Sequence, residues 1–380
     1  MRFPEFSGEW EKFRVSDFIE FFPTNSLSWD QLEYGGAGLL NLHYGMIHNG
    51  LPVQVDASKN ALPSIKEDFY PKKYTLCKEG DIAFADASED TNDVGKAIEF
   101  NNCAGKSIVC GLHTIHGRDR LGLTSIGFKG YLFSSKVYHD QIKSIAQGTK
   151  VFSIKASNFD EVILGLPKKE EQKKISSLLM AIDDRILTQS KIIEELKTLR
   201  SAIRYKLLHE MMVERIAKLG ELCRITTGKL DANAMVEGGG YPFFTCAEQV
   251  YEIDRYAFDT EALLVSGNGA NLGHIHYYCG KFNAYQRTYV LSDFSEDIQY
   301  LRQYLEAFLS KRIESEKNTG NTPYIVLGTL ADMDIKLPRV PEQQRIAHDL
   351  SVLTQKIENE IHIFELFIQE KKTLLDKMFI

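Results

Sequence analysis

The sequence predicts a chain of the α/β (α+β) class, in which two modules of mixed sheet and short helices each run into a long helix. The first observation is a repeat, because residues 166–208 and 337–379 align at a constant offset of 171 without a gap. The second is that both copies carry a helical apolar period, and the third is that the residues before each copy read as short strands with turns. A duplication of this length indicates one structural unit written twice.

Length and composition place the chain among globular proteins with room for two domains. It has 380 residues, 43% of them hydrophobic and 26% charged, close to globular averages. No apolar run reaches the roughly 18 residues of a spanning helix, so we expect no membrane segment and a cytoplasmic location. The six cysteines form no C-x-x-C pair and fit no zinc spacing, and His113 and His116 lack ligand partners at a suitable spacing. Reduced thiols and no metal site are therefore expected.

Residues 1–165 are predicted to form the first module. Strands are expected within 79–87 and 106–115, and a short helix over 134–146. A Gly-Thr loop follows at 147–150. Asp81 is expected to fix the turn of the Glu-Gly-Asp run that precedes a strand.

Residues 166–213 are predicted to form a long central helix. Apolar residues recur at spacings of three, four and seven from Ile175 to Leu207, and no Gly or Pro interrupts 168–208. Leu-Pro ends the preceding strand, and Glu170 and Glu171 suit the first turn of a helix. A helix of this length with a narrow apolar seam needs a partner.

Residues 214–336 are predicted to form the second module, and residues 337–380 a second long helix. Strands are expected within 261–278, with a turn at 266–271, and over 284–290, where Tyr285, Arg287 and Tyr289 would share one face. A short helix over 298–317 and a polar loop at 318–323 would follow. We expect repeated positions of the two copies to serve helix pairing or partner binding, namely Glu171, Gln172, Ile175, Leu179, Ile186, Glu342, Gln343, Ile346, Leu350 and Ile357.

Charge is spread so that no segment is a polycation. The net charge of −7 divides into −4 for residues 1–165, +3 for 166–215, −5 for 216–336 and −1 for 337–380. Any DNA binding must therefore be local, or shared with a partner.

Several motifs together resemble the specificity subunit of type I DNA restriction-modification systems. They are RFPEFSGEW at the start, EGDIAF at 79–84, GKFNAYQRTYV at 280–290, the Gly-Thr loops and the twice-written LPxxxEQxxI. The resemblance covers essentially the whole chain. It implies two target-recognition domains, each reading half of a split DNA site, and two long conserved helices that pair as an antiparallel coiled coil with internal pseudo-twofold symmetry.

The resemblance also implies partners. These are double-stranded DNA, two methyltransferase subunits and restriction subunits, with the helices acting as spacer and docking surface. The chain itself would be non-catalytic and hold no cofactor, since S-adenosylmethionine, ATP and Mg are expected on the partner subunits.

Candidate DNA contacts are polar and aromatic side chains of the two modules. Arg and Lys can bind guanine, Asn can bind adenine, and Thr or an aromatic ring can touch the thymine methyl group. The candidates are Asn41, His43, Tyr44, His48, His113, Thr114, Arg118, Lys150, Asn268, Tyr285, Arg287, Thr288, Lys317, Asn318, Thr319 and Asn321.

The sequence contains little that supports a catalytic function. AGKS at 104–107 lacks the glycine that a phosphate loop requires at position 100, where Phe100 stands. Neither a glycine loop for S-adenosylmethionine nor an Asn-Pro-Pro-aromatic pocket occurs. The alternative from another class is a helical protein-interaction scaffold whose modules bind protein, and salt-dependent DNA binding would distinguish it.

Overall fold

The computed structural model describes residues 1–36, 38–316 and 324–379. They form two compact units: unit 1 comprises Met1–Ser190 with Ile363–Ile380, and unit 2 comprises Lys191–His362. Each unit therefore contains one predicted module and part of each long helix. No described helix is long and apolar enough to cross a membrane.

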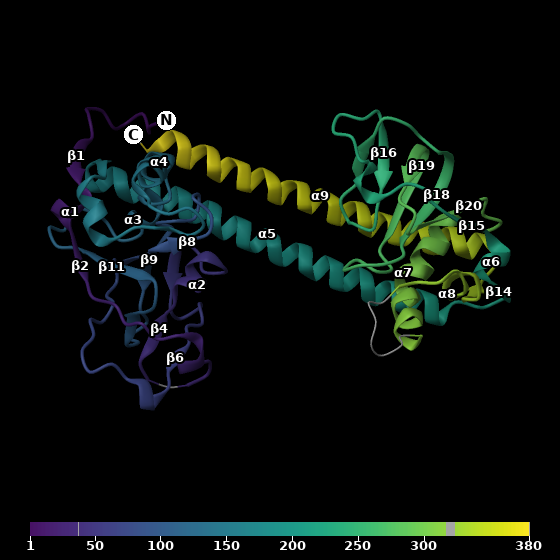
Figure 1. Ribbon diagram of the computed structural model, residues 1–380, viewed down its shortest axis with the longest axis horizontal. Helices are drawn as coiled ribbons and strands as arrows, with labels where there is room; N and C mark the ends of the chain where they lie inside the picture. Colours follow the sequence, from purple (N-terminus) through teal and green to yellow (C-terminus); the bar gives the residue numbers. More distant parts are fainter. Residues whose placement is uncertain (37, 317–323, 380) are drawn as a thin grey trace. The chain divides into compact units, whose positions relative to one another are not determined.

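Unit 1 is built on a mixed sheet with the order β2-β11-β7-β9-β5, beside a smaller sheet with the order β10-β4-β6-β3 (Figure 1). Its strands are β1 (Glu11–Arg14), β2 (Ile19–Phe22), β3 (Leu32–Glu33), β4 (Leu40–Leu42), β5 (Gln54–Asp56), β6 (Ser64–Ile65), β7 (Ile82–Ala85), β8 (Ala87–Ser88), β9 (Ala97–Asn102), β10 (Ile108–Cys110), β11 (Thr114–Asp119), β12 (Phe152–Ser153) and β13 (Ile163–Leu166). Its helices are α1 (Val15–Phe18), α2 (Tyr44–His48), α3 (Lys129–Leu132) and α4 (Lys136–Ile145), followed by the start of α5 (Lys169–Glu210). Short 3-10 turns lie at Trp29–Gln31, Glu67–Phe69 and Ala156–Asp160.

Unit 2 is built on a sheet with the order β15-β20-β18-β19-β16-β17. Its strands are β14 (Arg215–Lys218), β15 (Arg224–Thr227), β16 (Tyr241–Phe244), β17 (Tyr251–Ile253), β18 (Phe258–Ser266), β19 (Ile275–Ala284), β20 (Thr288–Ser292) and β21 (Asp334–Leu337). Its helices are α6 (Leu219–Leu222), α7 (Ile298–Ser315) and α8 (Leu327–Ala331), followed by the start of α9 (Val340–Met378), and a 3-10 turn lies at Ala232–Ala234.

The two units share one sheet topology, although their sequences look unlike. Strands β2, β11, β7 and β9 pair antiparallel in that order, and β5 joins β9 in parallel. Strands β15, β20, β18 and β19 also pair antiparallel in order, and β16 joins β19 in parallel. Equivalent strands follow each other along the chain in the same sequence, so both modules are versions of one fold.

A second shared feature is the base of each module. Strand β1 pairs antiparallel with β13, and β14 pairs in the same way with β21, the strand that ends in Leu-Pro. In both cases a four-residue helix follows the first strand, and its first amide donates back to the far side of the base, Val15 to Val162 and Leu219 to Met333.

Alternating strand residues feed two cores on opposite faces of each sheet. In β7, Ile82 and Phe84 belong to the core that faces α3, α4 and α5, whereas Ala83 and Ala85 belong to the core on the other face. Strand β18 divides its residues between two cores in the same manner. The period of two along a strand produces this division.

The long helices match their predicted spans within a few residues, and within each unit they run antiparallel. In unit 1, the Lys371 ammonium lies 2.6 Å from the Asp183 carboxylate, and Arg185 stacks over Phe367. In unit 2, Arg200 donates to the Thr354 hydroxyl at 3.3 Å. Pro341 occupies the first turn of α9, where its missing N–H costs no helical hydrogen bond.

One predicted strand is wrong. Residues 284–290 do not run as one strand, because Gln286 and Arg287 form a turn between the end of β19 and the start of β20. The turn carries the chain over β18, which pairs with both neighbours. The predicted alternation of Tyr285, Arg287 and Tyr289 therefore fails, while the turn expected at 266–271 does lie between two strands, β18 and β19.

Candidate nucleic-acid interface

The turn that enters β20 presents an exposed arginine. Arg287 is exposed, and its guanidinium makes no hydrogen bond or ion pair with the residues that the structure describes. Its backbone is nevertheless fixed, because the Gly267 amide donates to the Arg287 carbonyl at 2.9 Å. An anchored backbone with an exposed guanidinium is suited to binding an external partner.

The equivalent turn in unit 1 enters β11 and carries His113. The Asp86 amide donates to the His113 carbonyl at 3.1 Å, as the Gly267 amide does to Arg287. His113 has a backbone φ of 54°, a left-handed conformation that is uncommon for a non-glycine residue. Its ring nitrogen Nδ1 lies 3.0 Å from a carboxylate oxygen of Asp86. His113 and Arg287 thus occupy the same place in the shared sheet, each one residue before a buried threonine.

A third segment completes the match. The Ile154 amide donates to the Asp86 carbonyl, and the Ile325 amide donates to the Gly267 carbonyl, both at 2.9 Å. Ile154 and Ile325 are separated by the repeat offset of 171. The Gly-Thr loops precede these residues, so in unit 1 the exposed Lys150 belongs to a segment tied to the His113 turn. In unit 2, the candidates Lys317, Asn318, Thr319 and Asn321 lie outside the described residues.

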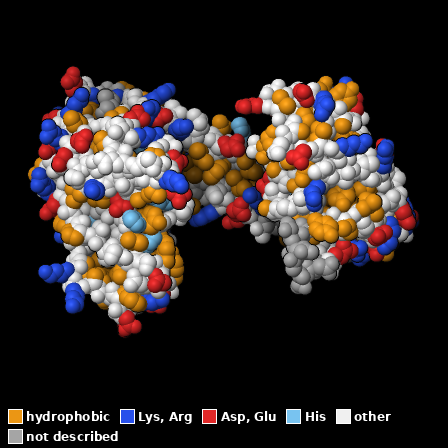
Figure 2. Space-filling view, in the orientation of Figure 1, with side chains coloured by type: hydrophobic (Ala, Val, Ile, Leu, Met, Phe, Trp, Pro, Cys, Tyr) orange, Lys and Arg blue, Asp and Glu red, His pale blue; other side chains and the backbone are white. Residues whose placement is uncertain are grey.

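Aromatic and imidazole rings surround the His113 turn. The Tyr44 ring meets the His113 ring edge to face at 5.1 Å and contacts His43 and His48 at 4.7 and 5.8 Å between centroids. Trp29, which the sequence did not single out, stacks on His43 at 4.4 Å. Figure 2 shows histidine side chains in pale blue beside hydrophobic side chains on the face of unit 1 in view. Segments about 70 residues apart in sequence therefore form one surface cluster.

In unit 2, Arg287 lines an open pocket of about 330 Å³ together with Thr227, Gln286, Tyr289 and Tyr324. Asn268 lies beside it, bridged through its backbone to Tyr324. Tyr285 is half-buried at the end of β19. The pocket lining combines a cation, an amide and aromatic rings, the side-chain types that read base edges and stack on bases.

Four candidates need correction, because burial removes them from any direct contact with DNA. Asn41, His43, Thr114 and Thr288 are at most 4% exposed. Asn41 accepts from the Asn25 amide, His43 caps α2 by accepting from the Gly45 amide, and the Thr114 hydroxyl donates to the Gly111 carbonyl. Their polar groups hold the backbone on which exposed candidates stand.

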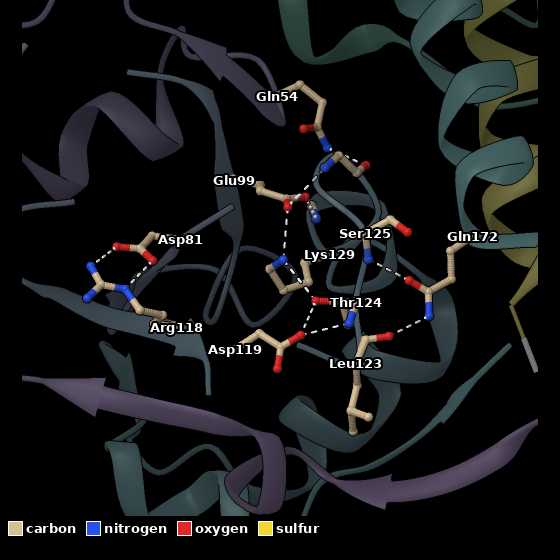
Figure 3. Close-up of polar contacts among 12 residues, drawn as sticks. Gln54, Asp81, Glu99, Arg118, Asp119, Leu123, Thr124, Ser125, Lys129 and Gln172 are labelled. Carbon is tan, nitrogen blue, oxygen red and sulfur yellow. Dashed lines mark hydrogen bonds and ion pairs between the residues drawn. The ribbon is translucent and has the colours of Figure 1, made fainter. Parts of the chain in front are cut away.

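Arg118 is a fifth correction, since its side chain is committed internally. Its guanidinium binds the Asp81 carboxylate through two nitrogens at 2.7 and 2.6 Å (Figure 3). It also stacks on the Phe22 ring. Burial raises the pKa of Asp81, but hydrogen bonds from Arg118 and His116 outweigh it and hold that pKa below its ordinary value. Asp81 also accepts from the Lys78 amide, which confirms its expected role in the turn.

The repeated glutamine anchors each module to the start of its long helix. In unit 1, the Gln172 amide group donates to the Pro167 and Leu123 carbonyls at 2.8 and 3.0 Å, and its oxygen accepts from the Ser125 amide at 2.7 Å (Figure 3). In unit 2, Gln343 donates to the Pro338 carbonyl at 3.0 Å and accepts from the Asp297 amide at 3.3 Å. Both side chains are buried. The repeated motif therefore joins a module loop to the Leu-Pro turn.

Behind the first anchor lies a buried ion pair that fixes the loop at 123–130. The Lys129 ammonium is 3.1 Å from the Glu99 carboxylate, which also accepts from the Gly127 and Gly130 amides. Lys129 donates in addition to the Thr124 hydroxyl (Figure 3). Because the two charges pair with each other and each makes further hydrogen bonds, their burial is tolerated.

Of the repeated positions expected to serve helix pairing or partner binding, only the apolar ones fit helix pairing. Ile175 and Leu179 belong to a core with Leu374 and Met378, and Ile186 packs against it. Ile346 and Leu350 share a core with Leu208 of α5 and with Met211, which follows that helix, and Ile357 is buried. Glu171, Gln172, Glu342 and Gln343 do not pair the helices. Glu171 pairs with Arg2, Glu342 with Arg345 of its own helix, and both glutamines with module loops.

Comparison with known proteins gives one family. A sequence profile described as the type I restriction modification DNA specificity domain matches residues 122–198 and 214–363. A relative from Escherichia coli, the type I restriction enzyme EcoDI specificity subunit, is 44% identical over 146 residues, which are 38% of this chain and 32% of that relative's length.

Two solved structures have a similar fold. The S subunit of a type I restriction-modification system from M. genitalium gives a TM-score of 0.62 at 18% identity, covering 98% of this chain and 96% of that one. A chain from a study of assembly and conformational transition in the type I R-M system gives 0.61 at 16% identity, covering 98% and 97%. At these identities the likeness concerns the fold alone.

Proposed function

Because the chain belongs to the family of the type I restriction modification DNA specificity domain, we propose that it is the subunit that selects the DNA sequence for a type I restriction-modification complex. Its two modules would each read half of a bipartite target. It would direct methyltransferase and restriction subunits to that target without carrying out chemistry itself.

The observation that carries the bipartite reading is the matched pair of entry turns. Both modules use the same sheet, the same backbone bonds to Asp86 and Gly267, and the same buried threonine after the turn. Yet the exposed residue at the turn is His113 in one module and Arg287 in the other. Two modules that share a backbone fold but carry different side chains at one exposed position are suited to recognising two different half-sequences.

The chemistry of the two turns differs in a way that suits two half-sites. A free guanidinium can bind O6 and N7 of guanine in the major groove with two parallel hydrogen bonds. Imidazole offers one donor and one acceptor when neutral, and Asp86 beside it fixes which nitrogen faces outward. Lys150, Tyr44 and His48 of the first module would add phosphate or stacking contacts.

The long helices would provide the partner surface and the spacing between half-sites. Both carry exposed apolar side chains that the cores of their units do not use, including Leu187, Leu199, Val352 and Leu366. These suit two copies of a methyltransferase subunit, one for each repeat, in a pseudo-twofold arrangement. S-adenosylmethionine, ATP and Mg would belong to the partners.

Net charge makes shared DNA binding the expected mode. At −7, the chain repels DNA at long range, so the partners must supply part of the phosphate-neutralising surface. The alternative function, a scaffold whose modules bind protein, predicts no sequence-dependent DNA binding at any salt concentration.

The test compares the isolated chain with its complex with the methyltransferase, by fluorescence anisotropy on a duplex carrying the methylated sequence and on a scrambled duplex. The complex should bind the first duplex far more tightly, and the logarithm of its affinity should fall linearly with the logarithm of the salt concentration. Equal binding to both duplexes, or tight specific binding by the isolated chain, would contradict the proposal.

A further inference from the structure

Two thiols and an imidazole that lie far apart in the sequence meet in the core of the first module. The sulfur atoms of Cys77 and Cys110 are 3.6 Å apart, and a ring nitrogen of His116 lies within 4.8 Å of both. All three side chains are buried. Cys77 precedes β7, Cys110 ends β10 and His116 lies in β11, so three separate segments of the module contribute.

The sulfur separation has the value that a shared cation would impose. Two thiolates bound to one tetrahedral zinc ion at about 2.3 Å each are about 3.8 Å apart. The observed 3.6 Å is close to this distance. A direct thiol–thiol hydrogen bond has a similar length, so the sulfur pair alone does not decide the matter.

His116 supplies the independent observation. Its Nε2 is 2.8 Å from a carboxylate oxygen of Asp81. Its Nδ1 is buried and has no hydrogen-bond partner among the residues that the structure describes. Zinc-binding histidines commonly bind the metal through one nitrogen while the other donates to a carboxylate, which fixes the tautomer and raises ligand basicity. A buried Nδ1 without a partner costs stability unless something binds it.

A third thiol, which would be a fourth donor, is nearby. The Cys103 sulfur lies 3.8 Å from the Cys77 carbonyl oxygen and belongs to the same buried core. Cys103 is therefore a candidate for a fourth ligand.

We propose that Cys77, Cys110 and His116 form a binding site for a thiophilic cation of the zinc type, in which Asp81 orients the His116 ring. Binding would displace the two thiol protons to solvent and form two metal–sulfur bonds and one bond to Nδ1. Cys110 and His116 stand three residues on either side of His113. A metal here would tie both ends of the entry turn together.

The first test measures metal in the purified full-length chain by inductively coupled plasma mass spectrometry, after equilibration with zinc and dialysis. Wild type should hold about one zinc ion per chain. Cys77→Ala and Cys110→Ala should lose it, whereas Cys223→Ala, which removes a buried thiol of unit 2, should keep it. Zinc retained by both ligand variants, or none in wild type, would overturn the proposal.

A second measurement does not depend on variants that fold. Cobalt(II) added to the zinc-free wild-type chain should give thiolate-to-metal charge-transfer absorption and the intense visible bands of tetrahedral cobalt, both removed by zinc. If the chain shows neither kind of absorption, titrates as six free thiols after unfolding and is not stabilised by zinc, then Cys77 and Cys110 are a buried thiol pair without a metal and the proposal is wrong. These readouts need no DNA, so they stand or fall apart from the proposed function.

Discussion

The glutamine of the repeated motif can be replaced at two equivalent junctions of the same chain, so that each variant serves as a comparison for the other. Replacing Gln172 by Ala removes the side chain that links the loop at 123–125 to the Leu-Pro turn before α5. Replacing Gln343 by Ala does the same to the junction before α9. Each change should loosen its own module loop and leave the other unaffected.

The magnitude follows from the bonds lost. The buried Gln172 side chain makes three hydrogen bonds of 2.7 to 3.0 Å, and each contributes roughly 1 kcal/mol, so the local cost is roughly 3 kcal/mol. The Asp297 amide bond to Gln343 is longer, at 3.3 Å, and the Glu296 carboxylate that Gln343 also binds keeps Arg215 as a partner. The second junction should therefore lose less, roughly 2 kcal/mol.

Native-state hydrogen exchange of the full chain measures these local openings. Protection of the Ser125 amide should fall roughly 100-fold in Gln172→Ala, since about 1.4 kcal/mol corresponds to a factor of ten. Protection around Asp297 should fall in Gln343→Ala. Gln344→Ala and Lys173→Ala, which alter the exposed neighbours, are the matched controls.

The reasoning is refuted if both glutamine variants exchange like their controls. It is also refuted if each variant loosens both modules equally, because the glutamines would then stabilise the helices as a whole. The repeated motif would in that case need a role in binding partners instead of anchoring modules.

Three further predictions concern the turn, the helices and the buried carboxylate. Arg287→Ala should weaken binding of the complex by about 1–3 kcal/mol and relax the target in one half-site only; equal weakening on all sequences would indicate a phosphate contact. Cysteines at positions 183 and 371 should be joined by a short thiol crosslinker, whereas cysteines at 175 and 346 should not, and the reverse result would indicate parallel helices. Asp81→Asn should destabilise unit 1 by ~2 kcal/mol at neutral pH in urea unfolding. Because the folded pKa of Asp81 is lowered, the wild-type advantage should be present above about 3.9, the ordinary value, and disappear as the pH falls through the folded pKa; a pH-independent difference would contradict this.

Helices were the most predictable part of the chain. The long helices expected within 166–213 and 337–380 correspond to α5 and α9, and the short helices expected at 134–146 and 298–317 correspond to α4 and α7. A long apolar period without Gly or Pro leaves little freedom of interpretation. The common sheet of the two modules was missed, because strand pairing depends on which segments meet, and unlike side chains can fill the same pleated positions.

The candidate site was predictable in its segments but not in its individual side chains. The runs containing His113 and Arg287 were both selected, and the fold places them at equivalent turns. Asn41 and Thr288 were selected because their side chains can bind bases, but both are buried. Which face of a strand a residue occupies decides its burial, and a short polar run does not reveal that face. The grouping of Cys77, Cys110 and His116 has no local spacing at all, since three segments supply one ligand each.

The central claim is that two modules of one fold read two half-sites, and sequencing the modified bases in a host that carries this chain with its methyltransferase partner tests it most directly. The account predicts one split motif, in which two short specified sequences are separated by a fixed stretch of unspecified bases. Modification of a continuous motif, or modification whose sequence does not depend on this chain, would contradict the claim.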